Sequence, residues 1–330
     1  MTPPHWSSWR EAMGRALYGE AGFYLTAGAP AGGFRTAAHA SPLWAAALLE
    51  LATRVNAALG SPADFAVVDM GAGGGELLAG MAASAPDHWL LVGVDVAPRP
   101  PELPDRVSWQ HDVPRGVSGL LMAIEYLDVV PVDVAELTET GCRLVEVSER
   151  GEERLGPEPP ERDLAWLRQW WPLAEVGDRA EVGHTRDAAW RQLSATVTAG
   201  LAVAVDYAAV PARDVAGTLT AYRDGRQLAA VPDGSCDLTA HVLLASLVAD
   251  GDVLLDQRHA LQALGISATR PRYGDDPAGY LAALSQAGEA AELTDPNGLG
   301  GFRWLLHPVG IVSPLSTVSG PPAPAPARRH

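Results

Sequence analysis

The sequence is poor in cysteine, in basic residues and in long apolar runs. Its two cysteines, Cys142 and Cys236, are too few for a metal cluster and lie in unrelated segments, so we expect a reduced, disulfide-free protein of the cytoplasm without a metal site. Asp and Glu outnumber Lys and Arg by 40 to 24 without any basic run, which argues against nucleic acid as a partner. The N-terminus lacks the apolar core of a secretion signal, and no apolar run is long enough to span a membrane, so no membrane partner is expected.

The composition is otherwise that of a folded α/β protein. With 47% hydrophobic residues, the 330-residue chain can form one large domain with an insertion or two modest domains. Segments suited to strands alternate with helical segments, which predicts a mostly parallel sheet covered on both faces. Helices are expected at Ser41–Leu59 and Glu76–Ser84, and strands at Trp89–Val96, Val107–Gln110, Gly119–Ile124 and Leu201–Asp206.

A glycine-rich turn follows the first predicted strand. The run V-V-D-M-G-A-G-G-G, Val67 to Gly75, is followed by a second apolar run that ends at Asp95. This arrangement is typical of a βαβ unit that binds a nucleoside. Gly71, Gly73 and Gly75 would let the backbone approach the ligand closely, and Asp95 would hold the ribose hydroxyls.

Two acidic residues indicate which nucleoside cofactor the turn would bind. Counted from Gly71, a dinucleotide fingerprint requires a small residue at the position of Glu76, where a carboxylate would repel phosphate. Asp69 completes the pattern D-x-G-x-G-x-G, which suits a ligand that carries an ammonium and a sulfonium. The turn therefore favours S-adenosylmethionine over NAD, with an ordinary tight strand-to-helix turn as the alternative.

Further acidic residues follow the third and fourth predicted strands. Ligands of open α/β sheets lie beyond the carboxyl ends of the strands, so Asp112 could accept a hydrogen bond from an adenine amino group, or be a surface turn residue. Glu125, with Asp128 nearby, follows the strand where a methyl acceptor would approach. Methyl transfer depends on alignment and needs one well-positioned carboxylate, and this pair could bind a guanidinium. A hydroxyl acceptor would instead require a histidine base, for which the candidates are His39, His184 and His241.

The segment between Pro131 and Trp171 interrupts the α/β alternation. Its residues alternate with period two about Thr140 and Gly141, which predicts a hairpin, and the Trp-rich stretch Asp163–Trp171 predicts a helix. We expect an insertion at about 131–180 that forms either a cap over the substrate side or an edge hairpin that completes the sheet. The Pro-rich segment 313–330 is predicted to be disordered.

Several motifs occur in a fixed order along the chain. They are M-G-R-A-L-Y-G-E-A-G-F-Y-L, G-G-F-R-T-A-A-H-A-S-P-L-W, V-V-D-M-G-A-G-G-G-E-L-L, I-E-Y-L-D-V-V-P-V, V-D-Y, G-T-L-T-A-Y-R and D-L-T-A-H-V. Together they resemble the MidA-type S-adenosylmethionine-dependent methyltransferases, over roughly Met13 to His307. The resemblance implies a Rossmann-like, seven-stranded class I methyltransferase domain over 61–312, with an N-terminal helical extension, 1–60, that packs on it, and with inserted elements.

Three departures from the family pattern limit what the resemblance implies about the acceptor. Mitochondrial members act in assembly of respiratory complex I and methylate an arginine of a partner subunit. This chain has Ile124 where the family has asparagine, and Gly33 and Leu243 where it has aspartate. Since the predicted cofactor residues persist while these polar positions have changed, we expect S-adenosylmethionine binding with an altered acceptor.

Three functions agree with these residues. The first is an active methyltransferase that uses Glu125 and Asp128 as catalytic residues and modifies a protein side chain, arginine-like, or a small molecule. The second is an assembly factor that binds the cofactor or a partner without turnover. The third is an NAD-dependent oxidoreductase, which Glu76 disfavours.

Overall fold

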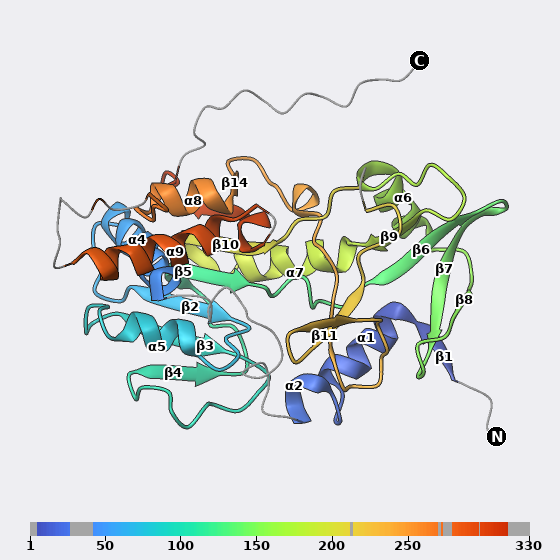
Figure 1. The fold of residues 1–330 in the computed structure, drawn as a ribbon, viewed down its shortest axis with the longest axis horizontal. Coiled ribbons are helices and arrows are strands. Elements are labelled where there is room, and N and C mark those ends of the chain that lie inside the picture. The colour runs from blue at the N-terminus through green and yellow to red at the C-terminus, as the bar shows by residue number, and fades with distance from the viewer. Residues whose placement is uncertain are drawn as a thin grey trace, which may run out of the picture.

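The largest described sheet has seven strands in the order β14-β15-β10-β5-β2-β3-β4, and β2, β3, β4 and β5 are seen on the left of Figure 1. The computed structural model describes residues 5–26, 42–211, 214–269, 272, 279–296 and 298–315. Neighbouring strands are parallel except at β15, which runs antiparallel to β10 and β14. The strands are β2 (Ala66–Met70), β3 (Leu90–Val94), β4 (Val107–Gln110), β5 (Val117–Ile124), β10 (Val197–Tyr207), β14 (Val253–Asp256) and β15 (Phe302–Val309). The predicted mostly parallel, seven-stranded α/β sheet is confirmed.

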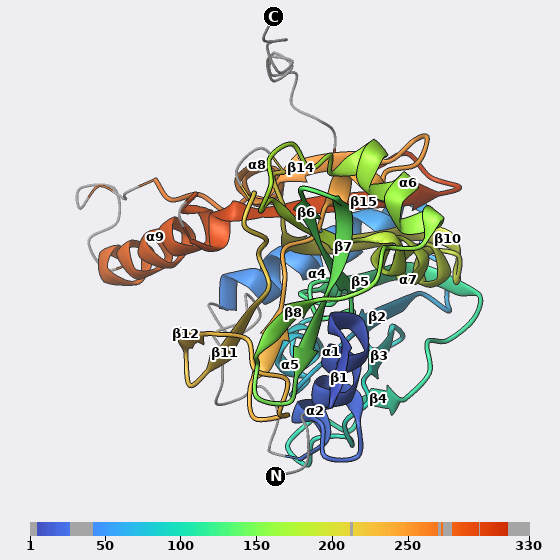
Figure 2. The same cartoon turned by 90° about the vertical axis from the view of Figure 1, so that its right-hand side faces the viewer.

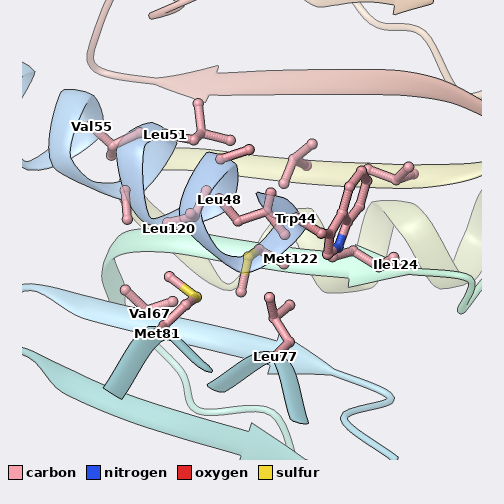
Figure 3. Close-up of a cluster of buried hydrophobic side chains, with 14 of the residues drawn as sticks. Trp44, Leu48, Leu51, Val55, Val67, Leu77, Met81, Leu120, Met122 and Ile124 are labelled. Carbon is pink, nitrogen blue, oxygen red and sulfur yellow. The ribbon is translucent and has the colours of Figure 1, made fainter. Parts of the chain in front are cut away.

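One face of this sheet is covered by four helices. They are α4 (Pro42–Ala58), α5 (Glu76–Ala82), α8 (Gln257–Ala263) and α9 (Tyr280–Thr294). Apolar residues of α4 recur at helical spacing and meet alternate residues of β5, because a strand points every second side chain to the same face. Figure 3 shows this contact, to which α4 contributes Trp44, Leu48, Leu51 and Val55 and β5 contributes Leu120, Met122 and Ile124.

The other face of the sheet packs against α7 (His184–Ser194). Trp190 and Leu193 of this helix are buried against the side chains that alternate with the first set, such as Leu121 and Ala202. The sheet is therefore covered on both faces, which explains why β5 and β10 are buried along almost their whole lengths.

A second sheet lies beside the first and has the order β1-β7-β6-β9, with β8 paired to β7. Its strands are β1 (Trp6–Ser8), β6 (Asp133–Thr138), β7 (Gly141–Ser148), β8 (Glu153–Leu155) and β9 (Arg179–Val182). Helix α6 (Glu161–Trp170) packs against it through Trp166 and Leu167, and α1 (Trp9–Tyr18) through Trp9 and Ala12. Figure 2, which faces this sheet, shows β1 and α1 beside β7.

A small third sheet packs on the N-terminal helices. Its strands are β11 (Thr220–Arg223), β12 (Arg226–Leu228) and β13 (Asp237–Thr239), and its neighbours are α1 and the short helix α2 (Phe23–Thr26). Ala221 and Leu238 are fully buried against Met13 and Leu17 of α1. This contact fixes the sheet near the strand ends of the large sheet, because α1 also packs on the segment that follows β5.

The local predictions match these elements closely, whereas the hairpin of the insertion does not join the large sheet as one of the two alternatives predicted. β4 has the predicted bounds, α4 occupies the predicted helix, and the hairpin β6–β7 and helix α6 occur within 131–180. The hairpin joins the second sheet and so does not complete the large one, and no described residue of 131–180 lines the cavity described below. The prediction that the hairpin completes the large sheet is therefore wrong, and the cap over the substrate side stays a prediction. The predicted helix cap Ser41 lies outside the described residues.

Residues 313–315 of the predicted disordered segment lie among the described residues, and Leu315 is buried in the core on the α4 face, so the prediction of disorder is wrong for these three residues. Residues 316–330 lie outside the described residues. The division into 1–60 and 61–312 stays a prediction. Among the described helices, none combines the length and the apolar character needed to cross a bilayer. Cys142 and Cys236 are both free.

Candidate functional site

A cavity of about 250 Å³ opens at the carboxyl ends of β3, β2, β5 and β10, which are neighbours in the large sheet. The turn after β2 and the residues after β3, β5 and β10 form one part of its lining. Residues of α1, α2 and the small sheet form the rest. Asp69, Gly71, Gly73, Asp95, Glu125 and Asp128, which the sequence predicts as site residues, all line this cavity.

The glycine turn adopts the left-handed backbone conformation that its sequence favours. Gly71, Gly73 and Gly75 have φ of 74°, 55° and 74°, which side chains on other residues resist. A Cβ on Gly71 would lie 3.2 Å from Cδ2 of Tyr126, a cavity residue. Gly75 does not line the cavity. A Cβ there would lie 2.7 Å from Cδ1 of Leu103, so the absence of a side chain at Gly75 lets Leu103 pack against the turn.

Asp95 is held by the backbone around it. Its Oδ2 accepts a hydrogen bond from the Gly73 N–H at 2.8 Å, and its Oδ1 accepts one from the Ala97 N–H at 2.8 Å. Partial burial raises the pKa of Asp95, and these backbone N–H groups oppose the rise. The carboxyl therefore joins the glycine turn to the end of β3, as expected for a group that meets a ligand bound across both.

Asp69 is buried at the end of β2 beside two other carboxyl groups. Burial is the main cause that raises its pKa from 3.8 to about 7, and the charges of Asp95 and Glu76 add to the rise. Three carboxyl groups thus converge on the part of the cavity beside the glycine turn, and Glu76, the first residue of α5, also lines it. A positively charged ligand would relieve this repulsion, whereas a phosphate would increase it.

Glu125 follows β5 in an unusual backbone conformation. Its φ is 49°, in the left-handed region that a residue with a Cβ rarely adopts, and its N–H donates to the Val205 carbonyl of β10 at 2.8 Å. A conformation of this kind persists only where the surroundings hold it. The turn directs the chain away from the sheet so that Glu125, Tyr126 and Asp128 all reach the cavity.

The segment after Glu125 is held by two buried ionisable side chains, Asp206 and Arg186, that the sequence analysis did not single out. Asp206, fully buried at the end of β10, accepts hydrogen bonds from the Leu127 and Asp128 N–H groups at 3.2 and 3.3 Å. Arg186 of α7 donates to the Asp128 carbonyl and to the His241 carbonyl, each at 2.7 Å. Burial raises the pKa of Asp206 well above its usual range, and the charge of Asp128 raises it further.

Asp128 is deeply buried, and its carboxyl is held by two other side chains. Its Oδ2 accepts a hydrogen bond from the Thr239 hydroxyl at 2.7 Å, and its carboxyl also shares a hydrogen bond with the carboxyl of Asp206. Burial raises the pKa of this carboxyl. The carboxyl of Asp128 is thus held in place at the cavity by Thr239 and Asp206.

Aromatic side chains make up much of the remaining lining. Five of the chain's seven tyrosines line the cavity: Tyr18, Tyr24, Tyr126, Tyr207 and Tyr222. The Tyr18 hydroxyl donates to the Val129 carbonyl at 3.0 Å, and the Tyr24 hydroxyl donates to Oδ1 of Asp237 at 2.7 Å. Burial and the charge of Asp128 raise the pKa of Asp237 to about 7.

Of the other residues that the sequence analysis named, some line the cavity, some lie elsewhere in the structure and some lie outside the described residues. Asp112 is exposed after β4 and does not line the cavity, so its contact with adenine stays a prediction. His241 lines the cavity, His184 does not, and His39 lies outside the described residues. Of the three departures from the family pattern, Ile124 lines the cavity, Leu243 packs against the cluster around Trp166, and Gly33 lies outside the described residues.

The residues that the sequence analysis missed come from distant segments. Asp206 stands in the motif V-D-Y at the end of a predicted strand, which is the signal that could have marked it. Tyr24 and Asp237 stand in two of the ordered motifs, but their meeting across 213 residues depends on the packing of the small sheet on α1. No described group of three or more metal-binding side chains could hold a metal ion.

Solved structures with the same fold come from Burkholderia thailandensis. One is a COG1565-superfamily protein bound to S-adenosyl-homocysteine, with a TM-score of 0.74 and 24% identity over 93% of this chain and 88% of that chain. The other is a native structure of a COG1565-superfamily protein, with a TM-score of 0.72 and 23% identity over 94% of this chain and 90% of that chain. At these identities the similarity shows the fold. No curated protein matches the sequence.

The sequence also matches a family at the level of its residues. The model of the family described as "Putative S-adenosyl-L-methionine-dependent methyltransferase" matches residues 85–254, just over half of the chain. The match begins after the glycine turn and includes Asp95, Glu125, Asp128, Asp206 and Asp237, so it covers residues from both parts of the lining together with the buried Asp206. The chain belongs to this family of S-adenosyl-L-methionine-dependent methyltransferases.

Proposed function

We propose that this methyltransferase is of the MidA type and transfers the methyl group to a cationic nitrogen acceptor, an arginine-like side chain of a protein or a small molecule with such a group. One observation carries the proposal. Six carboxyl groups line the cavity, from Asp69, Glu76, Asp95, Glu125, Asp128 and Asp237. No arginine is among the described lining residues, and the sequence contains no lysine. A cavity of this charge favours cationic ligands at both of its ends.

The residues on the cofactor side fit S-adenosyl-L-methionine. When bound, this cofactor supplies a methyl group on a positively charged sulfur. Asp95 would bind the ribose hydroxyls, Asp69 and Glu76 would lie near the positive charges, and Gly71 leaves room for close approach of the backbone. The S-adenosyl-homocysteine bound to the Burkholderia protein of the same fold supports this assignment.

Glu125 and Asp128 would act on the acceptor. Carboxylates form charge-assisted hydrogen bonds with a guanidinium and so orient one nitrogen for an in-line attack. That nitrogen must lose a proton as it gains the methyl group, and a carboxylate beside it can take the proton. Burial raises the pKa of Asp128, which makes it a better proton acceptor than an exposed aspartate. Ile124, at the cavity where the family pattern has asparagine, supports an acceptor other than that of the mitochondrial members.

Transfer from methyl-labelled cofactor tests the proposal. The purified protein is mixed with a lysate of its source cells that lacks it, and labelled species are separated and identified by mass spectrometry. We expect N-methylated guanidinium groups in the wild-type reaction and loss of label with Glu125→Gln. Glu139→Gln, an exposed residue in the β6–β7 turn, makes the same charge change and should keep full transfer. Label on oxygen or sulfur alone would contradict the proposal.

A hydroxyl acceptor is the second candidate, and His241 favours it. This histidine lines the cavity, stacks on Tyr207 with ring centroids 5.9 Å apart, and has its Nδ1 3.9 Å from Oδ2 of Asp214. A histidine with a carboxylate partner can serve as a general base for a hydroxyl. The same labelling experiment separates the candidates, because this one predicts an O-methyl product that is lost with His241→Gln and kept with Glu125→Gln.

A further inference from the structure

The small sheet presents alternate faces to the cavity and to the core. Thr220 and Tyr222 of β11, together with Asp237 and Thr239 of β13, line the cavity. Ala221 and Leu238, which stand between them, are fully buried on the α1 side. The register pairs Thr220 with Thr239 and Tyr222 with Asp237, so one sheet face forms a continuous wall. We call these four cavity-lining residues the acceptor wall.

Asp237 is the charged member of the acceptor wall, and it is held from another part of the chain. The Tyr24 hydroxyl of α2 donates to its Oδ1 at 2.7 Å. The ring of Tyr24 in turn lies against Tyr18 and Phe23, with centroids 5.5 and 5.3 Å away. The hydrogen bond from Tyr24 therefore fixes the direction of the Asp237 carboxyl. The neighbouring rings of Tyr18 and Phe23 limit the rotation of the Tyr24 side chain.

The wall joins the part of the cavity that contains Asp128. Thr239 of the wall donates a hydrogen bond to Oδ2 of Asp128 at 2.7 Å. Asp237 and Asp128 thus come from two different elements and line the same cavity among tyrosine rings. Carboxylates and aromatic faces both attract a cation, and a neutral ligand would leave the negative charge of the carboxylates without an opposite charge.

We propose that Asp237 is a specificity-determining residue that admits a cationic acceptor and rejects a neutral molecule of the same shape, and that Tyr24 is its positioning residue. This inference rests on the cationic acceptor of the proposed function and adds the residue that selects it. Asp237 pairs with the cation at the acceptor wall, whereas Glu125 lies in the turn after β5. Selection by charge and removal of the proton are thereby assigned to different elements of the fold.

Two probes of matched shape test this assignment. Protein saturated with S-adenosyl-homocysteine is titrated calorimetrically with n-butylguanidinium chloride and with n-butylurea, which has nearly the same shape but no charge. We expect the wild type to bind the cation at least tenfold more tightly, and Asp237→Asn to reduce that ratio below threefold without changing the affinity for S-adenosyl-homocysteine. Asp237→Glu should recover part of the preference. Asp224→Asn, an exposed position in the β11–β12 turn, is the matched control and should keep the wild-type ratio.

The outcomes separate this inference from the proposed function. A wild type that binds both probes equally overturns the cationic acceptor and the role of Asp237 together. A wild-type preference that persists in Asp237→Asn overturns the role of Asp237 alone. If Asp237→Asn no longer binds S-adenosyl-homocysteine, Tyr24→Phe decides the matter, because it removes the hydrogen bond and leaves the carboxyl. A lowered preference then supports the assignment, and an unchanged one overturns it.

Discussion

Binding of the cofactor should depend on pH through Asp69. Burial and two neighbouring acids raise the pKa of this residue in the folded chain from 3.8 to about 7. Protonated Asp69 therefore makes its full contribution to the free energy of unfolding below pH 3.8, the pKa of an ordinary aspartate. This contribution is lost as the pH rises through about 7, the pKa of Asp69 in the folded chain. The cost of ionising Asp69 in the folded chain reaches about 4 kcal/mol, and a cation beside the carboxylate would offset part of it.

The size of the effect on binding follows from the ionised fraction. If the cofactor binds the ionised form, its apparent dissociation constant is divided by the fraction of Asp69 that is ionised. With a pKa of about 7, that fraction falls from about 0.5 at pH 7 to about 0.03 at pH 5.5. The dissociation constant should then rise about fifteenfold over this range, and binding near pH 6 should release close to one proton.

Calorimetric titration with S-adenosylmethionine in two buffers of different ionisation enthalpy measures both quantities. The ammonium group of the ligand stays charged throughout this range. Asp69→Asn should bind more weakly at pH 7 and should lose most of the pH dependence, and any remainder would reflect Asp95, whose pKa burial also raises. Asp64→Asn, an exposed residue just before β2, is the control. Equal proton release by the wild type and Asp69→Asn would refute the reasoning.

Three further substitutions test other parts of the structure. Asp95→Ala should weaken S-adenosylmethionine binding by about 10- to 100-fold, since a charged hydrogen-bond acceptor is lost; unchanged calorimetric binding would remove Asp95 from the cofactor site. Asp206→Asn should lower the free energy of unfolding by about 1–3 kcal/mol and slow methyl transfer, with little change in cofactor affinity. The reason is that the asparagine amide cannot accept both backbone N–H groups of the segment after β5. Denaturant unfolding measures the stability, and transfer of labelled methyl groups measures the rate. Gly200→Ala should lower the free energy of unfolding in urea more than Gly141→Ala. The two glycines have similar φ, 123° and 118°, but a Cβ at 200 would lie 2.0 Å from the Gly119 carbonyl oxygen, whereas a Cβ at 141 meets open space. Equal losses of stability in the two variants would show that φ alone decides the effect.

The part of the site that could be predicted from sequence is the part encoded in one short stretch. Asp69, Gly71, Gly73 and Asp95 lie within a single βαβ unit, whose geometry follows from strand, turn and helix signals a few residues apart. Glu125 and Asp128 could be added because parallel strands bring their carboxyl ends to the same edge of a sheet. Sequence spacing was sufficient for these residues.

The remaining residues depend on contacts that spacing does not reveal. The sequence places Asp206 at the end of a predicted strand. Its hydrogen bonds to the N–H groups after Glu125 depend on the left-handed backbone conformation of Glu125, which no sequence pattern predicts. The predicted position of the hairpin at the edge of the large sheet is wrong, because its alternation specifies a hairpin without specifying its partner strands. Pairing of β7 with the N-terminal strand β1 took it into a second sheet, and the small sheet lines the cavity.

The hydrogen bond between Tyr24 and Asp237 also sets the order in which the site can be completed during synthesis. The two residues are 213 positions apart, so at about 5–20 residues per second the ribosome needs about 10–40 s to make the second after the first. The βαβ unit around Asp69 and Asp95 is made during that interval, while the apolar side of α1 still lacks Ala221 and Leu238 to cover it. In a growing chain the predicted cofactor residues are therefore present well before the acceptor wall is complete.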